Sequence, residues 1–265
     1  MTIAIDLEGK VIVVCGAARG GISGATARRI ALAGGTVVAV DQAQEIIDET
    51  IADIEAASGK CHGIVANLMD PAATDPIAES VFAKFGRLDG VANVAGGTKE
   101  QEWMPLEQTP TDMFRETLNL NLEYVFRMCR DAAAAMIKRR TGGSLVNVGS
   151  ISALTSAPWH GPYGAAKSGI SALTRTMAFE WHDYGIRANT VSPGAVYTKR
   201  IRDRAPAANV ISGKNDVWWA TVDDLANTIV FLLSDLASGI SGQTIVVDSG
   251  LSTKFCSGTR AKPQA

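Results

Sequence analysis

A tyrosine, a lysine and a serine stand at spacings that could support proton transfer. Tyr163 and Lys167 are four residues apart, so a helix would place them on one face. Pro162, just before Tyr163, suits the first turn of such a helix. A phenol with an ordinary pKa of about 10 is a poor base at neutral pH, but a nearby ammonium stabilises the phenolate and lowers that pKa. Tyr163 could then exchange a proton with a substrate oxygen that Ser150 holds.

A glycine-rich turn predicts a second property, the binding of a dinucleotide. The segment 16–24 reads GAARGGISG and lies between an apolar strand and a helix. Glycines let the backbone approach a pyrophosphate, and a helix N-terminus favours an anion. Asp41 ends the next strand, where a carboxylate accepts the ribose hydroxyls of NAD and repels the 2′-phosphate of NADP. Arg19 in the turn favours NADP instead, but we give Asp41 the greater weight and expect NAD, with NADP less favoured.

An alternation of short apolar strands and longer helices must position these residues. Strands are expected at 11–14, 36–40, 62–65, 88–93, 144–148, 187–191 and 243–247, and helices from the glycine turn to 33 and at 44–58, 72–85, 111–140, 162–182 and 222–233. Strands that are apolar throughout are typical of a parallel sheet covered by helices on both faces. The pattern predicts an α/β fold with a doubly wound parallel sheet, a Rossmann fold, in a single domain over 1–251, followed by a polar tail over 252–265.

Composition excludes several other classes of protein. The 265 residues are 46% hydrophobic and 20% charged, which is unlike a disordered chain, and the net charge of −2 argues against a nucleic-acid partner. No apolar run approaches the roughly 18 residues of a membrane span, and residues 1–10 do not resemble a signal peptide. Four scattered cysteines show no metal-binding spacing, so we expect no metal site and a reducing, cytoplasmic location.

Taken together, these residues resemble those of the short-chain dehydrogenase/reductase family in its one-domain form, over nearly all of residues 7–251. The resemblance implies a catalytic set of Ser150, Tyr163, Lys167 and Asn121, in which Asn121 holds a water in a proton relay. It implies a cofactor site made of Gly16, Arg19, Gly20, Gly21, Ile22, Asp41, Asn67, Leu68, Asn93, Ala95, Gly96, Tyr163, Lys167, Pro193, Gly194, Val196 and Thr198.

Three residues depart from the pattern of that family. The glycine turn is one residue longer than usual, and Ser23 stands where a third glycine is expected. Cys15 replaces a threonine before the turn, which removes one hydroxyl contact. Asn67 stands where an aspartate usually meets the adenine amino group, and its side-chain oxygen could still accept that hydrogen bond.

The sequence therefore predicts an oxidoreductase that moves a hydride between NAD and a secondary alcohol or ketone, with Tyr163 as the general acid–base. One alternative is a non-catalytic NAD(H)-binding sensor or scaffold, which predicts a damaged catalytic set. A second is a 3-oxoacyl-thioester reductase that uses NADPH. A dehydratase or epimerase needs a longer substrate region, and an enoyl reductase needs a wider spacing between its tyrosine and lysine than Tyr163 and Lys167 have.

The small-molecule substrate is expected to be a hydrophobic or cyclic alcohol. By resemblance, the substrate pocket lies near Ser152, Trp159 and His160, while Trp218, Trp219 and the arginines at 200, 202 and 204 stand in or beside a lid-like loop. Tryptophans would suit a flat alcohol, but they also pack under loops or at interfaces, and His160 could equally be an ordinary surface histidine.

The helix expected at 162–182 predicts an oligomer. It carries apolar residues on more than one face, namely Ile170, Leu173, Met177, Phe179 and Trp181, which is more than contact with one sheet requires. A second buried face implies a partner subunit, and the resemblance implies a homotetramer or dimer with helices paired across a two-fold axis.

Overall fold

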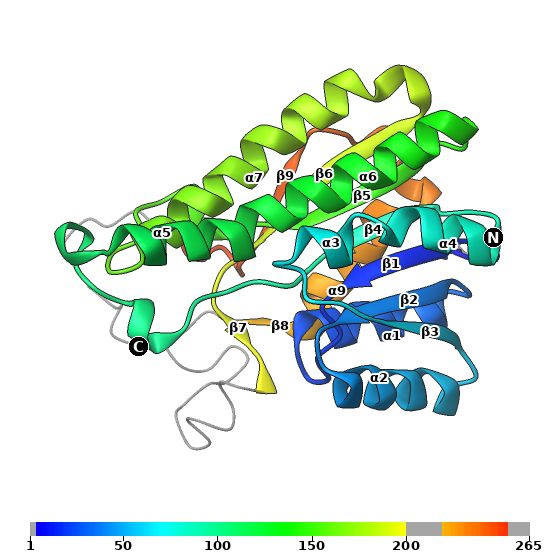
Figure 1. Cartoon of the computed structure of the whole chain (residues 1–265), viewed down its shortest axis with the longest axis horizontal. Helices are drawn as coiled ribbons and strands as arrows, with labels where there is room; N and C mark the ends of the chain where they lie inside the picture. The colour runs from blue at the N-terminus through cyan, green and yellow to red at the C-terminus, as the bar shows by residue number, and fades with distance from the viewer. Residues whose placement is uncertain (1–3, 200–218, 254–265) are drawn as a thin grey trace, which may run out of the picture.

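The computed structural model describes residues 4–199 and 219–253, in which strands and helices alternate (Figure 1). The strands are β1 (Val11–Cys15), β2 (Thr36–Asp41), β3 (Lys60–Val65), β4 (Gly90–Asn93), β5 (Gly143–Val148), β6 (Ile186–Pro193), β7 (Val196–Tyr197), β8 (Ala220–Thr221) and β9 (Thr244–Val247). The helices are α1 (Ile22–Leu32), α2 (Gln44–Ala56), α3 (Pro71–Thr74), α4 (Ile77–Phe85), α5 (Thr111–Leu118), α6 (Tyr124–Arg139), α7 (Gly161–Glu180) and α9 (Val222–Leu233).

Seven of the strands form one parallel sheet in the order β3-β2-β1-β4-β5-β6-β9. β1 lies between β2 and β4, so the sheet grows in opposite directions on its two sides. This order is that of a doubly wound Rossmann sheet, and it confirms the predicted fold class.

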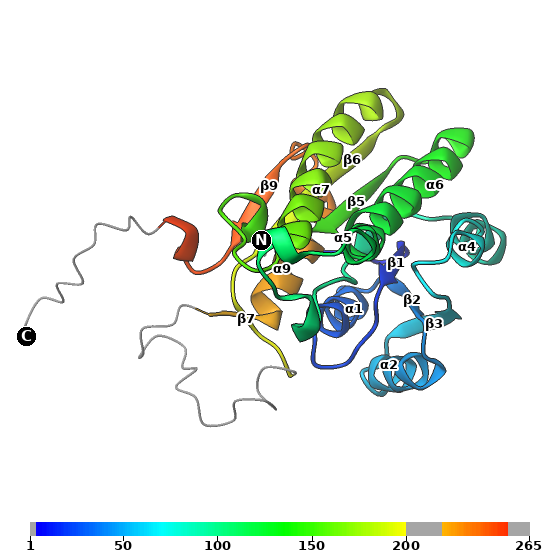
Figure 2. The same ribbon diagram turned by 60° about the vertical axis from the view of Figure 1, so that its left-hand side comes forward.

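Two hydrophobic cores cover the two faces of the sheet. In β1, Val11 and Val13 point into a core with α4, α6 and α7, whereas Ile12 and Val14 point into a core with α1, α2 and α9. Figure 2 shows α4, α6 and α7 on one side of the sheet and α1 and α2 on the other. The alternation follows from the two-residue period of a strand, and it explains why the central strands are apolar throughout.

The structure divides two of the predicted helices. The helix predicted at 111–140 is interrupted by a wide π-helical turn at Asn119–Glu123, which separates α5 from α6. Thr111 is the first helical residue of α5, and Pro110 precedes it. The helix predicted at 72–85 divides into α3 and α4 at Pro76, because proline has no amide hydrogen to continue the helical bonds.

The short strands β7 and β8 form a small second sheet next to the glycine turn. β7 pairs in parallel with β8, and Lys199, just after β7, donates its backbone hydrogen bond to the Gly20 carbonyl at 3.0 Å. Beyond β9, residues 251–253 form a short 3₁₀ turn, and the rest of the predicted tail lies outside the described residues. Among the helices of the described ranges, none is long and apolar enough to cross a membrane.

Candidate active site

The predicted site residues gather at the carboxyl ends of the central strands. Gly16 follows β1, Asp41 ends β2, Ser150 follows β5 and Pro193 ends β6. Because β1 has β2 on one side and β4 on the other, a crevice opens where the direction of sheet growth reverses. Ligands of open α/β sheets bind at such a point, so this edge of the sheet is where a ligand is expected.

Tyr163, Ser150 and Lys167 come together as the sequence predicted. Tyr163 lies in the first turn of α7, close enough to the Ser150 side chain for that side chain to lower the pKa of the phenol. Ser150 is held by the backbone after β5, where its Oγ accepts a hydrogen bond from the Ser152 amide at 3.1 Å. Lys167 follows one turn along α7, with its Nζ 5.5 Å from the centroid of the Tyr163 ring. This cluster joins a proton-transfer group, a hydroxyl and a cation.

Burial changes the protonation of both members of the helix pair. The Lys167 side chain is buried, its Nζ donates a hydrogen bond to the Val148 carbonyl at 2.8 Å, and desolvation lowers its pKa to about 7. Desolvation also raises the pKa of Tyr163, an effect that the hydrogen bond from Ser150 partly offsets. In this structure the group that lowers the pKa of Tyr163 is Ser150, and the lowering expected from Lys167 stays a prediction.

Asn121 is fully buried in the π-helical turn. Its Oδ1 accepts a hydrogen bond from the Gly97 amide at 2.8 Å. Its Nδ2 donates to the Gly97 carbonyl at 3.0 Å and to the Thr117 carbonyl at 3.1 Å. The side chain therefore donates a hydrogen bond to a backbone carbonyl of the widened helix, and it also holds the loop after β4 in place.

Gly96 permits Asn121 and Lys167 to lie against the same loop. Its φ is +136°, and a Cβ placed there would lie 2.6 Å from the Asn121 Oδ1 and 3.4 Å from the Lys167 Nζ. Any side chain at this position would push against the asparagine amide. The glycine thus brings the predicted relay residue close to the lysine.

The glycine turn forms a cradle with room for a phosphate group. Gly16 has a φ of +82°, and a Cβ there would press on Ala95 at 3.2 Å. α1 begins at Ile22, and no side chain caps the preceding Gly21. The turn, Asp41 and the loop after β4 line a cavity of about 610 Å³, a volume typical of ligand pockets. An open helix N-terminus beside this cavity fits the pyrophosphate of a dinucleotide.

The longer glycine turn keeps its close packing through a different residue. Ser23, which replaces the expected glycine, is buried in the first turn of α1. Gly24 makes the close approach instead, because a Cβ there would lie 2.8 Å from the Ala18 carbonyl oxygen. The insertion therefore moves the third glycine of the motif by one position. Gly24 is visible in the sequence, but the usual spacing of the motif places the third glycine at position 23.

Asp41 presents its carboxylate beside the cradle. Its two oxygens accept hydrogen bonds from the Ala17 amide at 3.0 Å and the Ala43 amide at 3.4 Å. It also lines an adjoining pocket of about 330 Å³ together with Asn67 and Leu68. The Asn67 Oδ1 accepts a hydrogen bond from the Met69 amide at 3.0 Å, so that oxygen already has one partner.

Some predicted cofactor residues line these two cavities and others do not. Gly16, Arg19, Gly20, Gly21, Ile22, Asp41, Asn67, Leu68, Ala95, Gly96 and Thr198 line one or both. Asn93 is buried between strands, where its Nδ2 donates a hydrogen bond to the Asn147 Oδ1 at 2.9 Å, so it supports the sheet instead. Pro193, Gly194 and Val196 also lie outside the two cavities, from the last residue of β6 to the first residue of β7.

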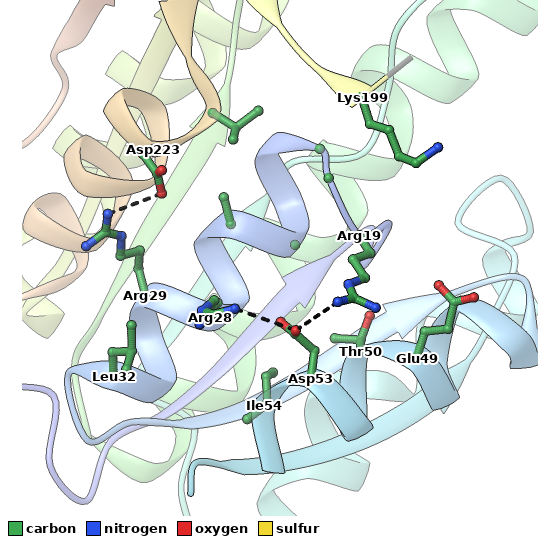
Figure 3. Close-up of a pocket in the computed structure, with 15 residues that line it drawn as sticks. Arg19, Arg28, Arg29, Leu32, Glu49, Thr50, Asp53, Ile54, Lys199 and Asp223 are labelled. Atoms are coloured by element: carbon green, nitrogen blue, oxygen red, sulfur yellow. Dashed lines mark hydrogen bonds and ion pairs between the residues drawn. The ribbon is translucent and has the colours of Figure 1, made fainter. Parts of the chain in front are cut away.

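Arg19 forms an ion pair with the neighbouring helix α2. Figure 3 shows its guanidinium next to Asp53 of α2, at 3.6 Å, and Arg28 of α1 contacts the same carboxylate at 3.6 Å. Arg19 still lines the cradle as well as this charged groove between α1 and α2. Asp53 thus pairs with the cation that could otherwise contact the 2′-phosphate of NADP.

His160 lies beside Tyr163 and Ser152 lies beside His160, and the substrate wall that the resemblance implies stays a prediction. The His160 ring centroid is 5.9 Å from that of Tyr163, and its Nε2 is 3.5 Å from the Ser152 Oγ. Trp159 is 58% exposed. Trp103, which the sequence analysis missed, stacks on His160 with a centroid separation of 4.5 Å. The arginines and Trp218 of the predicted lid-like loop lie outside the described residues.

The described residues include no group of histidine, cysteine or acidic side chains that could hold a metal ion. Burial raises the pKa of Cys61 to about 11 and that of Cys129 to about 12, so these thiols stay protonated at neutral pH. They are core residues and add no nucleophile to the site.

Comparisons with known proteins match nearly the whole chain. A family model described as enoyl-(acyl carrier protein) reductase matches residues 16–252. The 3-oxoacyl-[acyl-carrier-protein] reductase FabG of Thermotoga maritima is 33% identical over 92% of this chain and 98% of the relative. D-threitol dehydrogenase of Mycolicibacterium smegmatis is 32% identical over 94% and 95%. A solved 7α-hydroxysteroid dehydrogenase, in complex with NADH and 7-oxo glycochenodeoxycholic acid, superposes with a TM-score of 0.82 at 27% identity, over 92% of this chain and 95% of that one.

Proposed function

Because the chain belongs to the short-chain dehydrogenase/reductase family, whose members are oxidoreductases that use a nicotinamide cofactor, we propose that it transfers a hydride between NAD and a secondary alcohol or ketone. The observation that carries this proposal is the grouping of Tyr163 with Ser150, which lowers the pKa of the phenol, and with the buried Lys167, whose Nζ lies 5.5 Å from the centroid of the Tyr163 ring. A bound nicotinamide supplies or accepts the hydride, and the chain's own residues manage the proton.

In this proposal Tyr163 is the general acid–base at the substrate oxygen. Ser150 holds that oxygen, because its hydroxyl lies within hydrogen-bond reach of the phenol. Lys167, with a pKa lowered to about 7, can gain or lose a proton near neutral pH. Asn121 fixes the loop beside the lysine, and we propose that it supports the water through which protons leave.

We propose NAD as the preferred cofactor. The Asp41 carboxylate lies at the end of β2, next to the cradle for the phosphates, where it would accept ribose hydroxyls and repel a 2′-phosphate. The ion pair of Arg19 with Asp53 supports the same preference, because it occupies the cation that would otherwise attract that phosphate.

The proposed substrate is a hydrophobic or cyclic alcohol that lies against Trp159, Ser152 and His160. Trp103 and Trp159 offer apolar surface at this end of α7, which supports a compact ring as the substrate skeleton. The enoyl reduction named by the family model ranks lower, because Tyr163 and Lys167 are only one helical turn apart.

A second candidate is the reduction of a 3-oxoacyl thioester with NADPH. The FabG relative, which its name describes as a 3-oxoacyl-[acyl-carrier-protein] reductase, favours it. Asp41 argues against NADPH in this chain. A non-catalytic sensor is disfavoured, because Ser150, Tyr163 and Lys167 stand together and undamaged.

We propose a homotetramer or dimer, which remains a prediction together with the cytoplasmic location. Ile170 and Met177 of α7 are buried in the core of one subunit, whereas Phe179 is 87% exposed, and Phe126 of α6 is 41% exposed. Large exposed aromatic side chains on adjacent helices are typical of an interface between copies. Light scattering that gives a monomer of 27.8 kDa would contradict this part of the proposal.

The thermal stability of the protein with NADH, with NADPH and with neither tests the cofactor proposal. A ligand at 100 times its Kd adds roughly 2.7 kcal/mol to the free energy of unfolding, which is a readily measured rise in Tm. We expect a larger rise with NADH. A larger rise with NADPH would reverse the cofactor assignment, and no rise with either would favour a protein that binds no dinucleotide.

A further inference from the structure

Polar groups continue from the reactive phenol along one side of the site. Ser150 lies close enough to the Tyr163 phenol to lower its pKa, and the Ser150 Oγ accepts a hydrogen bond from the Ser152 amide at 3.1 Å. The Ser152 Oγ in turn lies 3.5 Å from the His160 Nε2. The proton chemistry proposed above uses only the first two residues of this row. Ser152 and His160 therefore have no part yet in the reaction.

The environment of His160 fixes which of its nitrogens can accept a hydrogen bond. Its Nδ1 lies 2.7 Å from the Pro158 carbonyl oxygen, and because a carbonyl can only accept, Nδ1 must carry the hydrogen. In the neutral imidazole, Nε2 is then an acceptor. This acceptor is the nitrogen that points to Ser152, on the side of the catalytic hydroxyls.

The His160 ring is also held in place by packing. Trp103 stacks on it with ring planes 20° apart, and the Trp103 Nε1 donates a hydrogen bond to the Thr98 Oγ1 at 2.9 Å. The Met104 amide donates to the Trp159 carbonyl at 2.7 Å, which ties the loop of Trp103 to the segment before His160. A ring fixed by a hydrogen bond and by stacking is oriented before any substrate arrives.

Ser152 and His160 together present one donor and one acceptor, because the serine hydroxyl can donate and the Nε2 can accept. A hydroxyl group complements this pair, since it accepts and donates through one oxygen. Their present contact of 3.5 Å is long for a hydrogen bond, so a hydroxyl that bridges them would improve on it.

We propose that Ser152 and His160 form a second polar subsite, which binds a hydroxyl on the carbon next to the reacting carbon. The substrate is then a vicinal diol or, in the reverse direction, an α-hydroxyketone, and the aromatic surface of Trp103 favours a cyclic one. This inference rests on the proposed function, because the reacting oxygen is taken to lie between Tyr163 and Ser150. It names the substrate class that the same site prefers.

Oxidation of matched cyclic alcohols with NAD tests the subsite. cis-Cyclohexane-1,2-diol, cyclohexane-1,3-diol and cyclohexanol share a ring and differ only in the second hydroxyl. We expect the wild-type kcat/KM for the 1,2-diol to exceed that for cyclohexanol by roughly tenfold or more, because a site that hydrogen-bonds a hydroxyl discriminates strongly against its absence. The 1,3-diol should resemble cyclohexanol.

Two variants separate recognition from folding. Ser152→Ala removes one oxygen, and His160→Phe keeps a ring that can stack on Trp103 but removes both nitrogens. Each should reduce the preference for the 1,2-diol over cyclohexanol several-fold, measured as the ratio of the two kcat/KM values within the same variant. Ser156→Ala, the same change at an exposed serine of the same loop, should change neither rate.

Each outcome bears on a defined part of the inference. Equal rates for the diol and cyclohexanol in the wild type, or an unchanged preference in Ser152→Ala, would overturn the subsite and leave the proposed function standing. Oxidation of none of the alcohols would overturn the proposed function and the subsite with it. A loss of rate that is equal for all substrates in both variants would show a structural role and would also overturn the subsite.

Discussion

Replacing Gly96 by alanine would disturb the proposed proton-transfer site through one close contact, between the new Cβ and the side-chain oxygen of Asn121. The new Cβ would lie 2.6 Å from the Asn121 Oδ1 and 3.4 Å from the Lys167 Nζ. The lysine contact is tolerable, but the amide oxygen has to retreat by roughly 0.8 Å to reach ordinary van der Waals contact. Such a shift breaks the 2.8 Å hydrogen bond between the Asn121 Oδ1 and the Gly97 amide.

The size of the effect follows from the hydrogen bond that is lost. A buried amide left without its partner costs about 1–3 kcal/mol, which corresponds to a roughly 5- to 150-fold lower kcat if Asn121 must be in place when the proton moves. The backbone strain of an alanine at positive φ, about 1–3 kcal/mol, is a separate cost in stability.

Gly97→Ala provides the matched control for that strain. Gly97 has a similar φ of +128°, but nothing lies within 4 Å of a Cβ placed there. The two variants should therefore show similar falls in Tm, while only Gly96→Ala loses most of its kcat in steady-state assays. Equal kcat values for the two variants would refute the positioning of Asn121 by this loop.

Three further predictions concern charged residues. Asp53→Asn releases Arg19 and should shift the ratio of the NADPH and NADH Kd values a few-fold towards NADPH, because an exposed ion pair is worth about 0.2–1 kcal/mol. Glu49→Gln, one turn away on α2, is the control. An identical ratio of Kd values in both variants would contradict the role of Asp53. Lys167 has its ordinary pKa of 10.5 in the unfolded chain, but in the fold its pKa is lowered to about 7. Burial of the lysine therefore destabilises the fold most below pH 7, where the buried amine is charged. This destabilisation decreases as the pH rises from 7 to 10.5. Lys167→Met should therefore raise Tm more at about pH 6.5 than at about pH 9.5, and a gain that is independent of pH would show that the lysine is not desolvated. Arg127 is buried and its Nη2 donates a hydrogen bond to the Leu68 carbonyl at 2.7 Å, so Arg127→Met should cost roughly 1–3 kcal/mol in urea unfolding and also weaken NADH binding through the pocket that Leu68 lines. An unchanged Kd for NADH would show that the bond to Leu68 serves folding alone.

The parts of the site that the sequence predicts depend on local spacing. Tyr163 and Lys167 share a helix face because they are four residues apart, and Asp41 and Ser150 reach the site because strand ends of a parallel sheet meet at one edge. The fold follows for a similar reason, since apolar strands alternate with helices along the chain.

The parts that the sequence does not predict depend on distant contacts. Trp103 stacks on His160 across many intervening residues, and Asp53 holds Arg19 from another helix. The wide turn at Asn119–Glu123 is compensated by the Asn121 side chain, which no helix propensity describes. The lowered pKa of Lys167 arises from burial, which only the packed structure determines.

The most direct test of the central claim compares the wild type with Tyr163→Phe in the formation of NADH from NAD and a panel of secondary alcohols. The ring hydroxyl is the only group that this change removes, so NADH binding, measured as the rise in Tm, should stay nearly intact while turnover is lost. Near-native turnover in Tyr163→Phe would contradict the assignment of Tyr163 as the general acid–base.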